Sequence, residues 1–350
     1  MRRVYLFRSP LPRVDEYSSA MAFRDSLGKS ILITGATGSF GNSLVSHLLA
    51  KSRFRKIVVF SRDELKQYEM RKRFQNNERL RWFLGDIRDQ NRLERAFSSI
   101  DVVVHAAALK QVDTAEYNPI EFVKTNVYGS QNVIEAALNC KVSKVIALST
   151  DKASSPINLY GATKLTADKL FISAKSYSDS KRTRFSVVRY GNVGGSRGSV
   201  IPHFLELKEK GLPLTVTSLE MTRFHIRLEQ AVELVSTAYE EMQGAELFVP
   251  KIPSYRVSDL VSILSPKKEI KLIGIRPGEK LHEEMISLDE GRRTFDSDGK
   301  YVILPEDYKK STKLKKVHDG FSYSSNTNSE FLDLIRLRKE VEIIKAKLSM

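Results

Sequence analysis

The chain contains almost no cysteine, since Cys140 is the only one among its 350 residues. An intrachain disulfide is therefore impossible, and the scarcity of thiols fits a reducing compartment, so we expect a cytoplasmic protein. The sequence also lacks a long apolar run, because no stretch approaches the roughly 18 residues that a membrane-spanning helix needs. We therefore expect no membrane partner.

Metal-binding and nucleic-acid-binding patterns are missing as well. His282-Glu283-Glu284 has no second histidine at the spacing of His-Glu-x-x-His, and no cysteine cluster exists, so we predict no metal site. The net charge is +15, but lysine and arginine are spread along the chain without a DNA- or RNA-binding motif. We expect anionic small molecules, and not nucleic acid, as the partners of this basic chain.

Short apolar runs alternate with helical patterns from residue 30 onward. The apolar runs predict strands over Ser30–Thr34, Lys56–Phe60, Leu80–Leu84, Val102–His105, Lys144–Ser149 and Phe185–Tyr190. Helical patterns fill the gaps over Asn42–Ala50, Glu64–Phe74, Asn91–Phe97, Asn126–Asn139 and Ala162–Tyr177. This alternation predicts an α/β fold with a Rossmann-like, doubly wound parallel sheet. After about residue 192 glycine and proline become frequent, which predicts a smaller, irregular C-terminal portion that binds substrate.

A glycine turn follows the first predicted strand. Its spacing is Gly-x-x-Gly-x-x-Gly, which lets backbone N–H groups approach a pyrophosphate at a helix N-terminus. Taken alone, the pattern also fits an ordinary connection between a strand and a helix. The predicted dinucleotide contacts in the turn are Gly35, Thr37, Gly38, Ser39, Phe40 and Gly41.

The end of the second strand bears on the choice of cofactor. NAD-binding Rossmann units usually place an acidic residue there, whereas this chain has Ser61 and Arg62, with Lys66 one turn later. The guanidinium of Arg62 suits a 2′-phosphate, so we predict NADP, with Asp63 keeping NAD as the alternative. The predicted cofactor contacts here are Ser61, Arg62, Asp63, Glu64, Leu65, Lys66 and Gln67, and further along the chain Asp86, Ile87, Ala106, Lys110, Tyr160 and Lys164.

The residues with the most distinctive chemistry follow the fifth strand. Thr150, Asp151 and Lys152 precede Tyr160 and Lys164. In a helix, Tyr160 and Lys164 share one face, and an ammonium beside a phenol favours the phenolate, which can act as a base. Asp151-Lys152 at the carboxyl end of a core strand is predicted to be catalytic, with a surface ion pair as the alternative.

Together and in this order, these motifs resemble the extended short-chain dehydrogenase/reductase family. Within it they are similar to the subgroup of inverting UDP-N-acetylglucosamine (UDP-GlcNAc) 4,6-dehydratases of pseudaminic acid biosynthesis. The resemblance runs from Lys29 to about Leu332, and Asp151-Lys152 and Arg276-Pro277-Gly278-Glu279-Lys280 make it specific. The chain departs from the subgroup at Gln111 and Asp113, where His and Pro are common, and at His225, which replaces a usual Trp.

The resemblance implies a substrate, a cofactor and a mechanism. The substrate is UDP-GlcNAc, the cofactor is a tightly bound and recycled NADP, and the protein is a homo-oligomer, either a dimer or a hexamer. Tyr160 takes the C4 hydroxyl proton, Thr150 binds the C4 oxygen, and Lys152 takes the C5 hydrogen if a crowded site depresses its pKa. Asp151 gives a proton to the departing C6 hydroxyl, which requires a raised pKa.

The resemblance also implies ligand contacts. Val193 lies near the nicotinamide, Arg223 and Arg276 bind the diphosphate, and Glu279 binds a ribose hydroxyl. The implied substrate contacts are Lys110, Thr125, Asn126, Asn192, Gly198, Ser199, Val200, Ile201, Arg223, Arg276 and Glu279. The alternatives are a retaining dehydratase or 4-epimerase of a UDP-sugar, and a non-catalytic NADP-binding sensor.

Four segments are expected. Residues 1–28 form a disordered extension, or else the start codon is assigned too early and Met21 is the true start. Residues 29–192 form the NADP-binding Rossmann domain, and 193–332 form the substrate-binding portion, with some elements returning to the Rossmann domain. In 333–350 the apolar residues at heptad spacing predict a helix that docks on its own domain or on another subunit.

Overall fold

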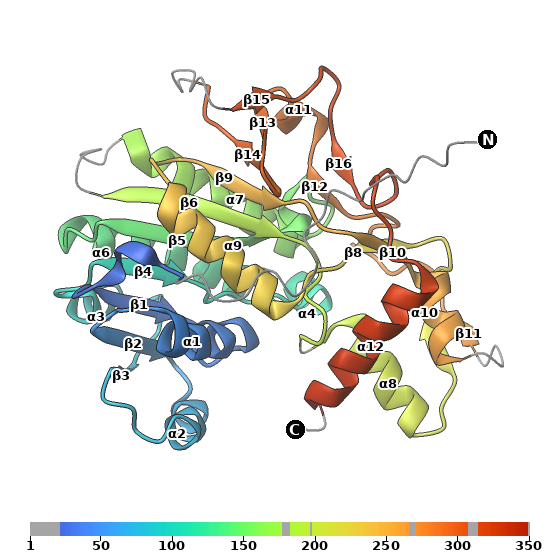
Figure 1. Cartoon of the computed structure of the whole chain (residues 1–350), viewed down its shortest axis with the longest axis horizontal. Coiled ribbons are helices and arrows are strands. Elements are labelled where there is room, and N and C mark those ends of the chain that lie inside the picture. The colour runs from blue at the N-terminus through green and yellow to red at the C-terminus, as the bar shows by residue number, and fades with distance from the viewer. Residues whose placement is uncertain (1–21, 177–182, 197, 266–269, 307–313, 349–350) are drawn as a thin grey trace, which may run out of the picture.

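The computed structural model describes residues 22–176, 183–196, 198–265, 270–306 and 314–348. Its centre is a sheet of ten strands within these ranges, in the order β15-β13-β14-β9-β6-β5-β4-β1-β2-β3 (Figure 1). The seven strands from β3 to β9 run parallel, and the other three are antiparallel. The strands are β1 (Ser30–Thr34), β2 (Lys56–Ser61), β3 (Leu80–Leu84), β4 (Val102–His105), β5 (Lys144–Thr150), β6 (Arg184–Tyr190), β9 (Leu247–Pro250), β13 (Thr294–Ser297), β14 (Lys300–Ile303) and β15 (Lys315–Lys316).

Helices cover both faces of this sheet. On one face α1 (Ser39–Lys51) packs beside α9 (Leu228–Glu241), and on the other face lie α3 (Gln90–Phe97), α6 (Gly129–Asn139) and α7 (Leu159–Ser173). The central strands are buried on both sides, which explains why they read as continuous apolar runs in the sequence. The predicted α/β class is confirmed, and the six predicted strands end within one residue of the observed ones.

A second, smaller core lies beyond the carboxyl ends of the parallel strands. Leu205, Leu260 and Leu337 belong to it, from α8 (Val200–Glu209), α10 (Val257–Leu264) and α12 (Leu334–Leu348). Figure 1 shows the red α12 beside α8 and α10, away from the main sheet. Since α9, β9 and β13–β15 return to the main sheet, the segment after residue 192 builds both parts of the molecule.

Short elements complete the fold. Three two-stranded sheets pair β10 with β8, β11 with β7 and β12 with β16. These remaining elements are α2 (Glu64–Arg73), α4 (Val112–Tyr117), α5 (Pro119–Phe122), α11 (Leu288–Gly291), β7 (Leu214–Val216), β8 (Thr222–Phe224), β10 (Ser254–Arg256), β11 (Ile270–Leu272), β12 (Glu284–Ile286) and β16 (Tyr323–Ser324).

The two ends of the described chain are both packed. Phe23 is fully buried, with its ring 5.8 Å from that of Phe54 and 5.1 Å from that of Tyr239. The prediction of a disordered extension up to residue 28 is therefore wrong for residues 22–28, and residues 1–21 lie outside the described residues. At the other end, the helical tail docks on its own chain through buried residues such as Val341 and Ile344.

A buried ion network joins the main sheet to the segment that carries α11. Arg189 in β6 has no exposed surface, and its guanidinium lies 3.1 Å from Asp168 of α7 and 2.9 Å from Glu290 of α11. Buried charges are tolerated when they are paired and hydrogen-bonded, as they are here. The network therefore holds α7, the sheet and α11 in one arrangement.

Candidate active site

A cavity of about 960 Å³ opens at the carboxyl ends of the parallel strands and extends towards the smaller core. Ligands bind at this edge in open α/β sheets. Most of the residues predicted from the sequence line it: Gly35, Thr37, Gly38, Ser39, Phe40, Gly41, Ser61, Arg62, Asp63, Lys66, Asp86, Ile87, Ala106, Lys110, Thr125, Thr150, Asp151, Lys152, Tyr160, Lys164, Asn192, Val193, Gly198, Ser199, Val200, Arg223, Arg276 and Glu279.

Five predicted contacts do not line the cavity: Glu64, Leu65, Gln67, Asn126 and Ile201. The amide of Gln67 donates to the carbonyls of Ser61 and Phe83, so it ties α2 to the sheet. Asn126 lies inside a wide helical turn before α6, and does not start a helix as predicted. Its amide accepts from the N–H of Leu109 and donates to the Leu109 carbonyl and to Thr163, so it is a structural brace.

The glycine turn has the close backbone contacts that its sequence predicted. Gly35 has a φ of 66°, and a Cβ there would lie 2.8 Å from the Cα of Ala107. A Cβ on Gly41 would lie 2.4 Å from Ala36, so both positions exclude a side chain. Gly38 caps α1 without a side chain, which leaves the first N–H groups of the helix for a ligand. The turn therefore fits a dinucleotide pyrophosphate.

The end of β2 places one cation at the cavity. The carboxylate of Asp63 accepts from the backbone N–H of Lys66 and lies 2.7 Å from the side-chain ammonium of Lys66. Asp63 is thus occupied as the N-cap of α2, as acidic residues often are. Arg62 remains more than half exposed and lies 3.9 Å from Asp86, whose carboxylate also pairs with Arg88.

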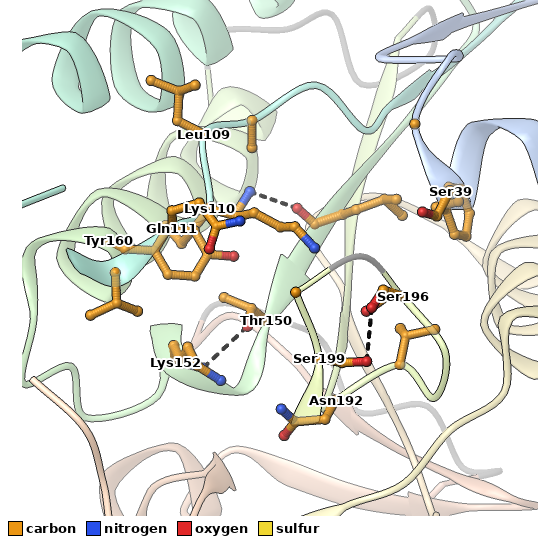
Figure 2. Close-up of a pocket in the computed structure, with 18 of the residues that line it drawn as sticks. Ser39, Leu109, Lys110, Gln111, Thr150, Lys152, Tyr160, Asn192, Ser196 and Ser199 are labelled. Carbon is orange, nitrogen blue, oxygen red and sulfur yellow. Dashed lines mark hydrogen bonds between the residues drawn. The ribbon is translucent and has the colours of Figure 1, made fainter. Parts of the chain in front are cut away.

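The segment predicted to be catalytic is held against the N-terminal turn of α7. Residues Asp151–Ala153 form a single helical turn after β5, and a Cβ on Gly161 would lie 2.2 Å from the carbonyl oxygen of Lys152. Asn158 caps α7 by accepting from the Gly161 N–H, and it donates to the carbonyl of Gly278 at 2.7 Å. Figure 2 shows Tyr160, Thr150 and Lys152 grouped on one side of the cavity, with Ser39 at the far side.

Tyr160 and Lys164 both lie buried on α7. The ammonium of Lys164 donates to the carbonyl of Leu148 at 2.7 Å. Burial raises the pKa of Tyr160 to about 12, while Lys152 and the Thr150 hydroxyl oppose that rise. The role of Lys164 in priming the phenol stays a prediction, because the contact with the Leu148 carbonyl uses one of the three N–H donors of the ammonium.

Lys152 lies between two carboxylates. Its ammonium is 3.2 Å from Asp151 and 3.3 Å from Glu283. Burial alone would lower the pKa of Lys152, but the two carboxylates raise it above its ordinary value, so the predicted depression is wrong. For Asp151 the prediction agrees with the structure, because burial raises its pKa and thus favours the protonated acid.

Several polar atoms in the cavity have no partner. Among the described residues, six buried side-chain polar atoms make no hydrogen bond. Four of them belong to the cavity lining: Thr125 Oγ1, Asp151 Oδ2, Asn192 Oδ1 and Glu283 Oε2. Because an unsatisfied buried polar group costs free energy, this cluster indicates a ligand rich in hydroxyl or amide groups.

The predicted diphosphate ligands, Arg223 and Arg276, both contact Glu279 at the cavity wall. Arg223 is buried and donates to the carbonyls of Lys280 and Leu281, while Arg276 is about half exposed and pairs with Glu279 at 3.1 Å. Two guanidinium groups therefore lie at the cavity: that of Arg276 is exposed, whereas that of Arg223 also donates to the Thr222 carbonyl and the Met221 sulfur.

The departures from the resembled subgroup lie in different places. Asp113 is 3.9 Å from the guanidinium of Arg276, and Gln111 lies against Gly198 at the cavity (Figure 2). His225 does not line the cavity, and its ring instead lies 3.0 Å from Glu340 of α12. The first two departures therefore bear on the ligand, and the third bears on how the tail helix docks.

The sequence predictions missed some residues of the cavity wall. Asn158, Ser196, Lys280 and Glu283 all line it. Glu283 was considered only as a metal ligand, although its place just after the Arg276–Lys280 motif was a signal. Within the described ranges no cluster of three or more His, Cys, Asp or Glu residues is placed to hold a metal ion. No described helix is long and apolar enough to cross a bilayer.

Comparison with known proteins identifies the family. The model of a family described as polysaccharide biosynthesis proteins matches residues 31–305, which is most of the chain. The chain belongs to this family. Within the polysaccharide biosynthesis proteins it is 50% identical, over 326 residues, to the inverting UDP-N-acetylglucosamine 4,6-dehydratase of Campylobacter jejuni, covering 88% of this chain and 97% of that protein.

Two other comparisons give a further relative and a solved structure that resemble this chain. It is 43% identical to the UDP-glucose 4-epimerase of Rickettsia massiliae, covering 79% of this chain and 82% of that protein. Its fold matches the crystal structure of Pen from Bacillus thuringiensis with a TM-score of 0.85 and 38% identity, covering 92% and 99% of the two chains. The resemblance to extended short-chain dehydrogenases/reductases is confirmed.

Proposed function

We propose that this protein is a UDP-GlcNAc 4,6-dehydratase that inverts C5 and supplies a 4-keto-6-deoxy sugar for surface glycan synthesis. The main support is the 50% identity to the C. jejuni enzyme across nearly its whole length. The observation within the molecule that carries the proposal is the position of Asp151 and Lys152 beside Tyr160 in one cavity. An acid, an amine and a phenol in one place can move the protons that a dehydration requires.

We propose a nicotinamide dinucleotide as cofactor, and NADP as the form that is bound. A bound nicotinamide would supply hydride transfer, first from C4 of the sugar and later back to C6. The turn around Gly35 and Gly41 suits the pyrophosphate, because a side chain at either position would collide with the backbone. Arg62 faces the cavity and Asp63 is occupied as a helix cap, which favours a 2′-phosphate over a free 2′-hydroxyl.

The chain's own residues would carry the proton transfers. Tyr160 accepts the C4 hydroxyl proton and Thr150, a hydrogen-bond partner of its phenol, orients the C4 oxygen. The resulting ketone acidifies the C5 hydrogen, which Lys152 removes once its amine is neutral. Asp151 holds a proton because burial raises its pKa, and it gives that proton to the C6 hydroxyl as water leaves.

The substrate would span the cavity from Asp151 to Arg276. The orphaned oxygens of Thr125 and Asn192 are proposed to bind the sugar, and Arg223 and Arg276 the diphosphate. Lys110, Gly198, Ser199, Val200 and Glu279 would complete the substrate contacts, and Val193 would lie against the nicotinamide. A homo-oligomer, either a dimer or a hexamer, and a cytoplasmic location stay predictions.

The decisive test is incubation of the purified protein with UDP-GlcNAc without added cofactor. We expect loss of one water from the sugar nucleotide by mass spectrometry, because the bound cofactor is recycled. In deuterated water, NMR should show deuterium at an inverted C5. The Lys152→Ala variant should lose this activity while UDP binding, followed by calorimetry, is kept. Water loss at the wild-type rate in Lys152→Ala would contradict the proposed mechanism.

A 4-epimerase is the second candidate, because of the similarity to the Rickettsia protein. Epimerisation needs no acid at C6 and no base at C5, so it leaves Asp151 and Lys152 without a task. The same incubation separates the two activities. UDP-N-acetylgalactosamine formed without loss of water would establish the epimerase and reject the dehydratase.

A further inference from the structure

Lys152 presents a chemical problem that the dehydratase mechanism leaves open. Its ammonium touches both Asp151 and Glu283, and an ammonium cannot remove the C5 proton. Some group must first take a proton from it. Asp151 cannot be that group if it is to act as the acid for the C6 hydroxyl, because it then already carries a proton. Among the groups in contact with the Lys152 ammonium, Glu283 is the carboxylate that remains.

Glu283 is built into the site as a proton acceptor would be. It is 3% exposed, it lines the cavity, and its Oε2 atom has no hydrogen-bond partner. Its Oε1 atom lies 3.3 Å from the Lys152 ammonium and 3.6 Å from the guanidinium of Arg223. Lys280 adds a further positive field at Glu283. Burial alone would raise the pKa of Glu283, but Lys152 and Arg223 hold it low, so it is ionised at rest.

The cations and carboxylates alternate from the reaction centre to the cavity mouth. After Lys152 and Glu283 come Arg223, then Glu279 at 3.6 Å from Arg223, then Arg276 at 3.1 Å from Glu279. The two arginines in this series are the proposed diphosphate ligands. A bound diphosphate therefore adds negative charge next to the guanidinium that keeps Glu283 ionised, and a nearby like charge favours the protonated carboxyl group.

We propose that Glu283 takes the proton from the Lys152 ammonium when the diphosphate of the substrate pairs with Arg223, so that substrate binding itself produces the neutral amine. The inference rests on the proposed function. In this step one N–H bond of Lys152 breaks and an O–H bond forms on Glu283, which leaves an amine beside a carboxylic acid. No redox change is involved. Glu283 acts through Lys152 and is therefore a positioning residue for that proton.

The rest of the cycle restores the starting state. The amine of Lys152 takes the C5 proton and becomes an ammonium, while the proton of Asp151 leaves in the water. The hydride then returns to C6. C5 receives a new proton, and this is balanced by the proton that the C4 hydroxyl released through Tyr160. As product leaves, the proton on Glu283 passes through Lys152 to Asp151. The Lys152 ammonium can relay this proton because it lies 3.2 Å from Asp151 and 3.3 Å from Glu283.

The test compares the holoenzyme with Glu283→Gln, which keeps the size of the side chain but cannot accept the proton. We expect kcat for water loss to fall about 100-fold or more, as for the loss of a proton acceptor. C4 oxidation, seen as near-ultraviolet absorbance of the reduced nicotinamide, should persist, and deuterium at C5 of the substrate should slow the variant more than the wild type. UDP should bind at least as tightly, because Arg223 loses a competing carboxylate.

Two further variants complete the experiment. Glu283→Asp keeps the charge but withdraws it by one methylene, so it should show the same C5 isotope effect with a smaller loss of kcat. Glu206→Gln removes an exposed carboxylate that is paired with Lys210, and should behave as wild type. If Glu283→Gln does not fold, Glu283→Asp decides the question, and a full rate in it overturns the inference.

The remaining outcomes also decide. If Glu283→Gln works at the wild-type rate, the proposed role of Glu283 is wrong. The same holds if this variant loses UDP binding and C4 oxidation together. Neither outcome affects the proposed function, because the wild type still dehydrates UDP-GlcNAc. A wild-type protein that does not dehydrate UDP-GlcNAc overturns the proposed function, and this inference with it.

Discussion

At the scale of single residues, the proposed preference for NADP rests on Arg62. Arg62→Ala should weaken NADP binding about 10- to 100-fold, because a guanidinium–phosphate contact is worth roughly 1.5–3 kcal/mol. Binding of NAD should change little, since NAD lacks the phosphate. Fluorescence titration of protein freed of its cofactor measures both affinities.

The control for this prediction is Arg336→Ala, which removes an exposed arginine of α12 that pairs with Glu330. It should leave both affinities unchanged. Equal losses for NAD and NADP in Arg62→Ala would mean that Arg62 contacts a part common to the two cofactors.

Local patterns revealed many of the site residues but not their charges. Thr150, Asp151 and Lys152 were predictable because they lie at the end of a core strand, and Tyr160 because it stands four residues before Lys164 in a helical pattern. The part that Glu283 plays in raising the pKa of Lys152, beside that of the neighbouring Asp151, was not predictable, since Glu283 is distant in the sequence and reaches the amine only through the fold. In the same way, nothing local to Lys164 indicates that the Leu148 carbonyl holds it.

At the scale of elements, the contact between α7 and the turn Asp151–Ala153 sets the geometry of the site. Gly161→Ala would place a methyl group 2.2 Å from the Lys152 carbonyl, so the helix and the turn must separate. We expect kcat to fall at least 10-fold, because small misplacements of reacting groups are costly, while cofactor binding is kept. Product formation and cofactor content measure the two effects.

Thr166→Ala is the matched control, because Thr166 lies exposed on the same helix and its hydroxyl bonds only the Ala162 carbonyl. It should keep full activity. If Gly161→Ala were as active as this control, the close contact between α7 and the turn would not matter for catalysis.

The parallel strands were more predictable from the sequence than the antiparallel strands and the contacts between distant segments. The strands of the parallel sheet are apolar runs that end at turn residues, so the sequence marks them directly. The antiparallel strands β13 and β14 carry mixed polarity, with burial that varies along each strand, and β15 is two exposed lysines, so these strands give no such signal. Phe23 was likewise missed, because its burial depends on the distant Tyr239.

At the scale of the whole molecule, the Arg189 network contributes to stability. Glu290→Gln would leave the fully buried guanidinium with one carboxylate fewer, and we expect the apparent free energy of unfolding at pH 7 to fall by about 3 kcal/mol. Urea denaturation followed by circular dichroism measures the change. Glu342→Gln, an exposed change on α12, is the control and should have little effect.

The pH dependence of this loss has a definite sign. Burial alone would raise the pKa of Glu290, but Arg189 holds it below the ordinary value of 4.5. A lowered pKa in the folded state adds stability above about pH 4.5, and this stability is lost as the pH falls through the folded pKa. The difference between wild type and Glu290→Gln should therefore shrink in acid, and a constant difference would contradict the ion pair.

The place of β9 in the main sheet has a consequence for engineering. Val187 and Val188 of β6 pair with Leu247 and Phe248 of β9. A fragment that stops near residue 192 would therefore leave β6 as an unpaired edge strand of the parallel sheet. Swapping everything after that point between relatives, in order to exchange sugar specificity, would replace strands of the main sheet together with the substrate-binding residues. Grafts would have to be piecemeal, with the returning strands left in their native context.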